Sequence, residues 1–127
     1  MIRTILPLTA SALLLAGCVT TRASEDGSVD ARLGQTVNVG GPRVTPLAVL
    51  EDSRCPMEAR CIRAGSVRLK VRVTTGTGSA VREVASDKLL QVADGQLELS
   101  GVMPPRSVRG PIKPGDYRFT FKFSGGL

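Results

Sequence analysis

Two stretches of the chain alternate strictly between apolar and polar residues. Residues 67–74 read Val-Arg-Leu-Lys-Val-Arg-Val-Thr, and residues 117–124 read Tyr-Arg-Phe-Thr-Phe-Lys-Phe-Ser. A period of two sends successive side chains to opposite faces, which is typical of a strand with one buried and one solvated face. We therefore predict strands over both stretches, with their aliphatic and aromatic positions in the core.

Shorter apolar stretches predict five further strands, at residues 36–39, 44–50, 80–85, 89–93 and 97–99. Turn-forming residues separate them, as in Gly-Gly-Pro at 40–42 and Asp-Gly at 94–95. Beyond residue 17 we find no long segment of helical period. Several short strands at this spacing predict an all-β fold, a small antiparallel β-sandwich of immunoglobulin-like form with about seven strands, over residues 34–127.

The first residues follow the plan of a secretory signal peptide. Arg3 is followed by residues 5–17, Ile-Leu-Pro-Leu-Thr-Ala-Ser-Ala-Leu-Leu-Leu-Ala-Gly, and then by Cys18. This run is too short to span a bilayer, which takes about 20 apolar residues. The alternative, a buried N-terminal helix, is disfavoured by Pro7 and Gly17. The sequence Leu15-Ala16-Gly17-Cys18 resembles the lipobox of bacterial lipoproteins.

The lipobox resemblance implies a membrane anchor. In lipoproteins the cysteine receives a diacylglycerol thioether and becomes the first residue after cleavage, so residues 1–17 would be the signal peptide and Cys18 the lipid attachment site. Val19 stands where an aspartate retains enterobacterial lipoproteins at the inner membrane, which favours the outer membrane, facing the periplasm. Residues 18–33 are polar and irregular, and they predict a flexible tether between lipid and domain.

Cysteine usage agrees with an exported chain. The chain has three cysteines, and once Cys18 carries lipid, Cys55 and Cys61 remain as a pair. In the oxidising periplasm we expect them to form a disulfide. The alternative is a Cu(I) site in which both thiolates and the Met57 thioether are ligands. Because we favour the disulfide, we expect no metal and no cofactor.

The segment around this cysteine pair carries a second resemblance. Residues 51–65 read Glu-Asp-Ser-Arg-Cys-Pro-Met-Glu-Ala-Arg-Cys-Ile-Arg-Ala-Gly. They resemble a family of small uncharacterised bacterial exported proteins in which Asp-Ser-Arg-Cys-Pro precedes a spacer, Cys, an aliphatic residue, usually Trp, and Ala-Gly. The likeness covers residues 44–123 and includes Pro104-Pro105, Ile112 and Gly115-Asp116-Tyr117, but Arg63 replaces the usual tryptophan. The family implies no activity.

Two interpretations of this disulfide-closed loop stay open. In the structural one, Asp52 and Ser53 bond nearby backbone amides and Arg54 pairs with an acidic neighbour, Asp52 or Glu51. In the other, the loop is a recognition loop on a rigid scaffold. The side chains that such a loop would present to a partner are Arg54, Met57, Glu58 and Arg60.

The formal net charge is +6, and a basic stripe, Arg68, Lys70 and Arg72, lies on the polar face of the first alternating stretch. Our hypothesis of one cationic sheet face adds Arg82, Arg118 and Lys122. Such a face is either simply solvated or binds an anionic partner, such as lipid phosphates or a cell-wall polymer. Nucleic acid is not expected, because the chain lacks interleaved aromatic and basic residues.

Catalysis is not expected either. The chain has no histidine, which excludes Ser-His-Asp and Cys-His hydrolysis in their usual forms. Glu51 and Asp52 are neighbours on a strand, so their carboxylates point to opposite faces rather than across one cleft. The sequence predicts a lipid-anchored, non-catalytic envelope protein, a structural or protein-binding module that contacts another envelope protein or a cell-wall component. The alternative is a ligand-binding or enzyme-inhibitor module that uses the Cys55–Cys61 loop.

Overall fold

The computed structural model describes residue 17 and residues 26–125. The predicted leader apart from Gly17, the predicted lipid site Cys18 and residues 19–25 of the predicted tether lie outside the described residues. The described elements are β1 (Val29–Ala31), β2 (Val37–Asn38), β3 (Arg43–Asp52), β4 (Val67–Thr75), β5 (Gly78–Ala85), β6 (Leu90–Val92), β7 (Gly95–Met103), the 3-10 turn η1 (Pro114–Asp116) and β8 (Arg118–Gly125).

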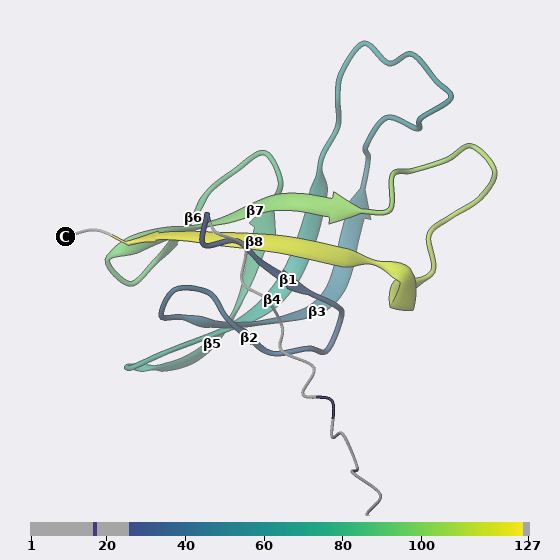
Figure 1. Ribbon diagram of the computed structural model, residues 1–127. Coiled ribbons are helices and arrows are strands. Elements are labelled where there is room, and N and C mark those ends of the chain that lie inside the picture. Colours follow the sequence, from purple (N-terminus) through teal and green to yellow (C-terminus); the bar gives the residue numbers. More distant parts are fainter. Residues whose placement is uncertain (1–16, 18–25, 126–127) are drawn as a thin grey trace, which may run out of the picture.

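These strands form two four-stranded sheets, ordered β1-β8-β7-β6 and β2-β3-β4-β5, in which neighbours are antiparallel. The sheets lie face to face (Figure 1), so the predicted small antiparallel β-sandwich is confirmed. Each sheet is mainly a meander of consecutive strands, whereas immunoglobulin sheets combine strands from separate parts of the chain. The exception is β1, which crosses over to pair with β8.

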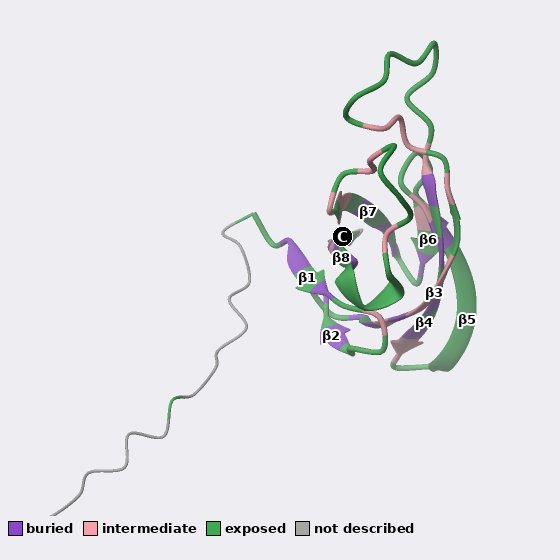
Figure 2. Ribbon diagram, turned by 90° about the vertical axis from the view of Figure 1, so that its right-hand side faces the viewer, coloured by how far each residue is buried: buried purple, intermediate pink, exposed green. Residues whose placement is uncertain are grey.

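The core residues come from strands of both sheets, and Figure 2 shows the buried segments of these strands in purple. The inward residues of β4 are buried, among them Val67, Leu69 and Val71, and Phe119 and Phe121 face them from β8. Both strictly alternating stretches therefore contribute strands and core residues as predicted. Each fully buried Val, Leu or Phe contributes about 1.5–3 kcal/mol relative to an exposed one.

The domain begins before residue 34. Val29 and Ala31 are buried, and they lie opposite Phe121 and Phe119 of β8. The tether predicted over residues 18–33 is therefore too long at its C-terminal end, because β1 lies inside it. A strand of three residues with a central Asp30 gives no periodic signal, and its pairing partner is distant in the sequence.

Two other strands are longer than predicted, and their pairing is irregular. The register of β7 against β8 shifts between Leu99 and Gly101, and the strand continues to Met103 beyond the predicted 97–99. The register of β3 against β4 shifts twice, after Pro46 and after Val49, so that β3 reaches Asp52. Within residues 26–125, no helix is long and apolar enough to cross a membrane.

Candidate functional site

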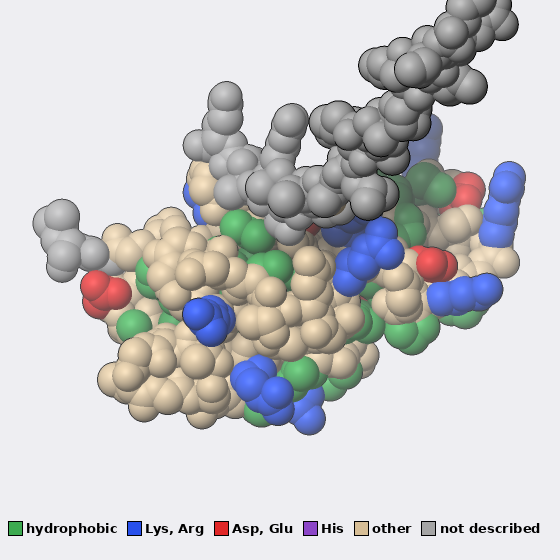
Figure 3. Space-filling view, turned by 60° about the horizontal axis from the view of Figure 1, so that its bottom comes forward, with side chains coloured by type: hydrophobic (Ala, Val, Ile, Leu, Met, Phe, Trp, Pro, Cys, Tyr) green, Lys and Arg blue, Asp and Glu red, His purple; other side chains and the backbone are tan. Residues whose placement is uncertain are grey.

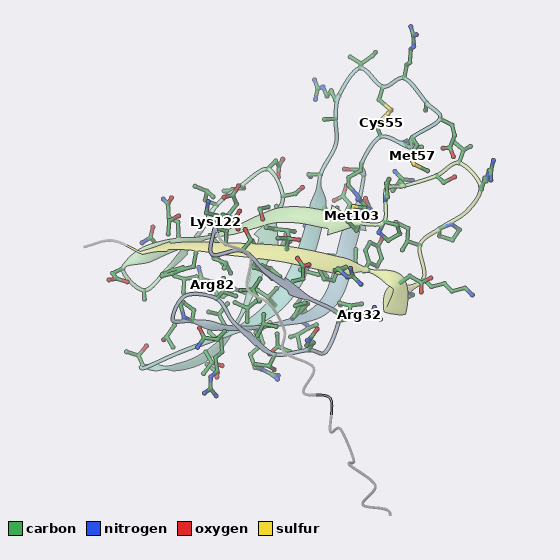
Figure 4. All side chains as sticks on the ribbon, viewed as in Figure 1. Arg32, Cys55, Met57, Arg82, Met103 and Lys122 are labelled. Carbon is green, nitrogen blue, oxygen red and sulfur yellow. A yellow bond between two sulfur atoms is a disulfide. The ribbon has the colours of Figure 1, made fainter. Side chains whose placement is uncertain are left out.

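Two long connections meet at one end of the sandwich. Residues 53–66 join β3 to β4, and residues 104–113 lead from β7 towards η1. In Figure 1 the first of these loops stands clear of the sheets, and the second lies beside its base. We call these two segments together the loop platform. Figure 4 shows Cys55, Met57 and Met103 at this end, whereas Arg82 and Lys122 lie along the strands.

Hydrogen bonds join the two loops into one unit. The Met57 N–H donates to the Arg106 carbonyl at 2.9 Å. The Glu58 carboxylate accepts from the Ser107 hydroxyl at 2.6 Å and from the Val108 N–H at 3.1 Å. These donors hold the pKa of Glu58 below its ordinary value. The carboxylate of Glu58, one of the predicted recognition residues, therefore bridges the two loops.

Cys55 and Cys61 form a disulfide, as predicted. Because the two sulfurs are bonded to each other, the Cu(I) alternative with Cys55, Met57 and Cys61 is wrong for this structure. Closing so short a loop stabilises the fold by about 2 kcal/mol in the chain-entropy description. Together with the hydrogen bonds to the second loop, the disulfide limits the conformations of the loop tip.

Backbone hydrogen bonds within the cysteine segment build the neck of the 53–66 loop. The Ser53 N–H donates to the Ser66 carbonyl at 2.8 Å, and the Cys55 N–H donates to the Ala64 carbonyl at 3.2 Å. Gly65 has a φ of +69°, and a Cβ there would collide with the Ser53 carbonyl. Only glycine satisfies both conditions, so this part of the motif has a structural role.

Arg54 turns into the domain instead of facing a partner, which corrects its place among the predicted recognition residues. Its guanidinium binds the Asp52 carboxylate through two nitrogens, at 2.9 and 2.8 Å. It also donates to the carbonyls of Val102 at 2.8 Å and Pro104 at 3.1 Å. The side chain is only 19% exposed. Arg54 thereby links the end of β3 to the beginning of the second loop.

The Asp52 carboxylate is the centre of this polar cluster. It accepts a 2.9 Å hydrogen bond from the Tyr117 hydroxyl besides those from Arg54. Burial alone would raise the pKa of Asp52, but the bonds from Arg54 and Tyr117 outweigh it and lower the pKa below its ordinary value. Burial and the bond to Asp52 raise the pKa of Tyr117 to about 12. Asp52 is thus held as an anion by two neighbours, and its role is structural.

The outward side chains of the loop platform are apolar and basic. Met57 is 64% exposed, Val108 is 65% exposed and Ile62 is fully exposed. Arg60, a predicted recognition residue, is also exposed, as are Arg63, Arg109 and Lys113. Sequence reasoning missed Ile62 and Val108. The sequence signal that could have identified them is a large aliphatic residue in a loop with an arginine nearby on each side, because a residue outside the strands is not buried by a sheet.

The basic stripe on β4 is partly neutralised. Arg68, Lys70 and Arg72 share the outer face of their sheet, as the alternation predicts. Arg68, however, forms ion pairs of 2.8 Å with Glu51 on β3 and with Glu83 on β5. The outer face of this sheet is therefore less cationic than the stripe alone suggests.

The three other basic residues do not join that face, so the hypothesis of one cationic sheet face is wrong. Arg118 and Lys122 lie on β8, in the other sheet. Arg82 lies opposite the buried Val71, and directly opposed residues of antiparallel strands point to the same side, so Arg82 is on the inner side of β5. Strand alternation cannot show which sheet a strand joins. In Figure 3, Lys and Arg side chains form separate groups.

The polar groups beside Tyr117 already have partners within the domain. Among the described residues, no three His, Cys, Asp or Glu side chains are placed to hold a metal ion together. A pocket of about 150 Å³ beside Tyr117 is lined by Asp52, Arg106, Gly110, Pro111 and Ile112. The Asp52 carboxylate in this pocket already accepts a hydrogen bond from the Tyr117 hydroxyl. Comparison of the chain with protein-family models, curated proteins and solved structures gives no match.

Proposed function

We propose that this protein is a lipid-anchored, non-catalytic binding module of the bacterial cell envelope, which presents the loop platform to another envelope component. The observation that carries the proposal is that apolar side chains, Ile62 above all, are exposed on loops that are themselves braced. Exposed apolar side chains grouped together mark interaction surfaces. A loop that is already held in one conformation loses less conformational entropy on binding than a flexible loop does.

The lipid anchor of the proposal rests on the lipobox at Leu15-Ala16-Gly17-Cys18. Since the sandwich already includes Val29, seven residues separate Cys18 from Asp26, and the eight Cα–Cα steps between them span at most about 27 Å. The intact mass of protein purified from its native membrane tests the anchor. We expect a chain that begins at Cys18 and carries two or three acyl chains, with Cys55 and Cys61 alkylated only after reduction. A mass that still includes Met1 would contradict it.

The binding face can be tested by site-specific photo-crosslinking in intact cells. A photoreactive residue at position 62 should crosslink to an envelope component, and the same residue at position 81 serves as the matched control. Val81 is 49% exposed on β5, away from the loop platform. Crosslinking that is no stronger at position 62 than at position 81 would contradict the proposed binding face.

The enzyme-inhibitor alternative has less support. An inhibitor of that kind presents an extended loop whose backbone is free to bond the enzyme. Here the Met57 N–H bonds the second loop, and the Ala59 N–H closes a turn on the Pro56 carbonyl at 3.1 Å. The 53–66 loop is therefore folded on itself, and its side chains rather than its backbone are available.

A further inference from the structure

The exposed apolar side chains of the loop platform are aliphatic or thioether groups. Ile62, Val108 and Met57 are the exposed examples, and no aromatic residue occurs in either segment. The aromatic rings of β8 and of Tyr117 pack in or against the core. Protein interfaces draw most of their affinity from Trp, Tyr and Arg side chains in shape-matched pockets, and aliphatic tips without aromatic neighbours do not fit that description well.

The charge of the loop platform points to an anionic surface. Its two segments contain six Lys and Arg residues and a single acidic residue, Glu58. Glu58 is hydrogen-bonded between the loops, while the cations other than Arg54 and Arg106 are exposed. The exposed cations are Arg60, Arg63, Arg109 and Lys113.

The shape of the loop platform also indicates what kind of surface it fits. The 53–66 loop protrudes beyond the sheets (Figure 1), and the fully exposed Ile62 lies between Arg60 and Arg63 in the sequence. A protruding tip suits a flat, deformable surface that needs no matching cavity. An aliphatic side chain can enter the boundary of the acyl chains while neighbouring arginines bind phosphates with two hydrogen bonds each.

We propose that the loop platform binds the surface of an anionic phospholipid bilayer, with Ile62, Met57 and Val108 at the level of the headgroups and the exposed cations on lipid phosphates. This inference rests on the proposed function, because it names the component that the binding face contacts. The hydrogen bonds between the loops and the Cys55–Cys61 disulfide limit the conformations of these loops before binding, so contact with the bilayer requires little further ordering.

The bilayer can be the one that holds the predicted anchor. The chain enters β1 along the side of the sandwich, where Val29 lies opposite Phe121. β1 runs antiparallel to β8, so Ala31 lies nearer the loop platform and Asp26 lies towards the opposite end of β8. A reach of up to about 27 Å between Cys18 and Asp26 allows the domain to lie with its strands along the membrane, so that the lipid and the loop platform contact the same bilayer. Two linked contacts then bind together more strongly than either alone.

The test uses the chain from Val19 to Leu127, which contains every described strand but carries no lipid. Its flotation is measured with phosphatidylethanolamine vesicles that contain or lack phosphatidylglycerol. We expect binding only when phosphatidylglycerol is present, and binding that weakens as salt rises. Replacing both Arg60 and Arg63 with Gln should weaken binding about 25-fold, at about fivefold for each charge. Ile62→Ser should weaken it about tenfold.

The matched control replaces Lys70 and Arg72 with Gln, which removes the same charge from the outer face of β4. It should change vesicle binding less than about twofold, since charge away from the contact is screened. Circular dichroism and urea unfolding confirm that each variant is folded. An equal loss in the control, or no binding to phosphatidylglycerol vesicles, overturns the inference. If the bilayer inference fails in this way, the crosslinking experiment still tests the proposed function. Crosslinking of position 62 to a protein would support the proposed function without the bilayer contact, and no crosslinking at position 62 would contradict the proposed function as well.

Discussion

The hydroxyl of Tyr117 donates a 2.9 Å hydrogen bond to Oδ2 of Asp52, a residue 65 positions earlier in the chain. Asp52 ends β3 in one sheet, and Tyr117 precedes β8 in the other. Arg54 binds the same carboxylate, the carbonyl of Val102 in β7 and the carbonyl of Pro104 at the start of the second loop. At this end of the sandwich, polar bonds therefore hold the sheets together where the apolar core stops.

The pKa of Tyr117 can be read directly, because the chain has one tyrosine and no tryptophan. Absorbance at the phenolate band should titrate with a midpoint of about 12. In Asp52→Asn the midpoint should fall towards the ordinary value of 10.0, whereas Glu51→Gln, on the outward side of β3, should leave it in place. Because the folded pKa exceeds the unfolded one, this contribution to stability is full below pH 10 and is lost as the pH rises towards 12. An unshifted midpoint in Asp52→Asn would contradict the assignment.

Asp52 should also make the fold sensitive to acid. Its pKa is lowered in the folded state, so the stability it contributes is present above the unfolded pKa of about 3.9 and is lost as the pH falls through the folded value. Urea unfolding should therefore show a steeper decline in stability between neutral pH and about pH 3 for the wild type than for Asp52→Asn. Equal declines would show that Asp52 does not contribute. The lowered pKa of Glu58 accounts for part of the decline that remains in the variant.

Arg54→Met should destabilise the domain by about 3 kcal/mol. The substitution leaves the largely buried Asp52 carboxylate without its cation and leaves the carbonyls of Val102 and Pro104 without this donor. Urea unfolding measures the loss. Arg72→Met, on the exposed face of β4, is the control and should stay within about 0.5 kcal/mol of wild type. Similar losses in the two variants would mean that the bonds of Arg54 add nothing beyond its hydrophobic stem.

Gly65→Ala should destabilise the domain by about 2 kcal/mol or more. Alanine at a φ of +69° is strained, and its Cβ would collide with the backbone carbonyl of Ser53. Gly110→Ala is the matched control in the second loop, where a Cβ would meet nothing within 4 Å. Thermal unfolding of both variants measures the difference. A Gly65→Ala protein as stable as Gly110→Ala would contradict the proposed role of the neck.

Arg82→Val should promote self-association. β5 is an edge strand, and Arg82 on its inner side lines an open groove of about 280 Å³ with Val73, Ala80 and Val92. An inward-pointing charge on an edge strand opposes the addition of another strand, because pairing would bury it. Light scattering should detect self-association about tenfold tighter in Arg82→Val than in Arg72→Val, whose side chain lies on a central strand. No difference between the two variants would contradict this role.

Local alternation is sufficient to predict β4 and β8 because each buries one face over its whole length. β1 could not be predicted in the same way, since Val29 and Ala31 become core residues only when β8 lies beside them. The same limit applies to the cationic face. Alternation shows that Lys70 and Lys122 both point outward, but not that they do so from opposite sheets.

The candidate site also has some features that the sequence predicts and others that it does not. The count of three cysteines, with Cys18 predicted to carry lipid and an oxidising periplasm expected, predicts the disulfide of Cys55 and Cys61, and this prediction is confirmed. Arg54 could be expected to pair with Asp52, two residues away, but not to bind carbonyls 48 and 50 positions further along. Its inward orientation depends on where the second loop lies, which no local pattern contains. The exposure of Ile62 follows from its position in a loop, but the hydrogen bonds that join the two loops, such as that from the Met57 N–H to the Arg106 carbonyl, do not.

The crossover of β1 to β8 has a consequence for the order in which the domain can fold. Val29 needs Phe121 as its partner, and β8 also lies between β1 and β7. The meander of β2 to β5 can form as soon as its own residues have been synthesised, but the other sheet lacks one of its two central strands until β8 is complete. Non-local pairing of this kind slows folding. Loss of the last strand would therefore remove the centre of a sheet rather than fray its edge, and would leave β1 without a partner.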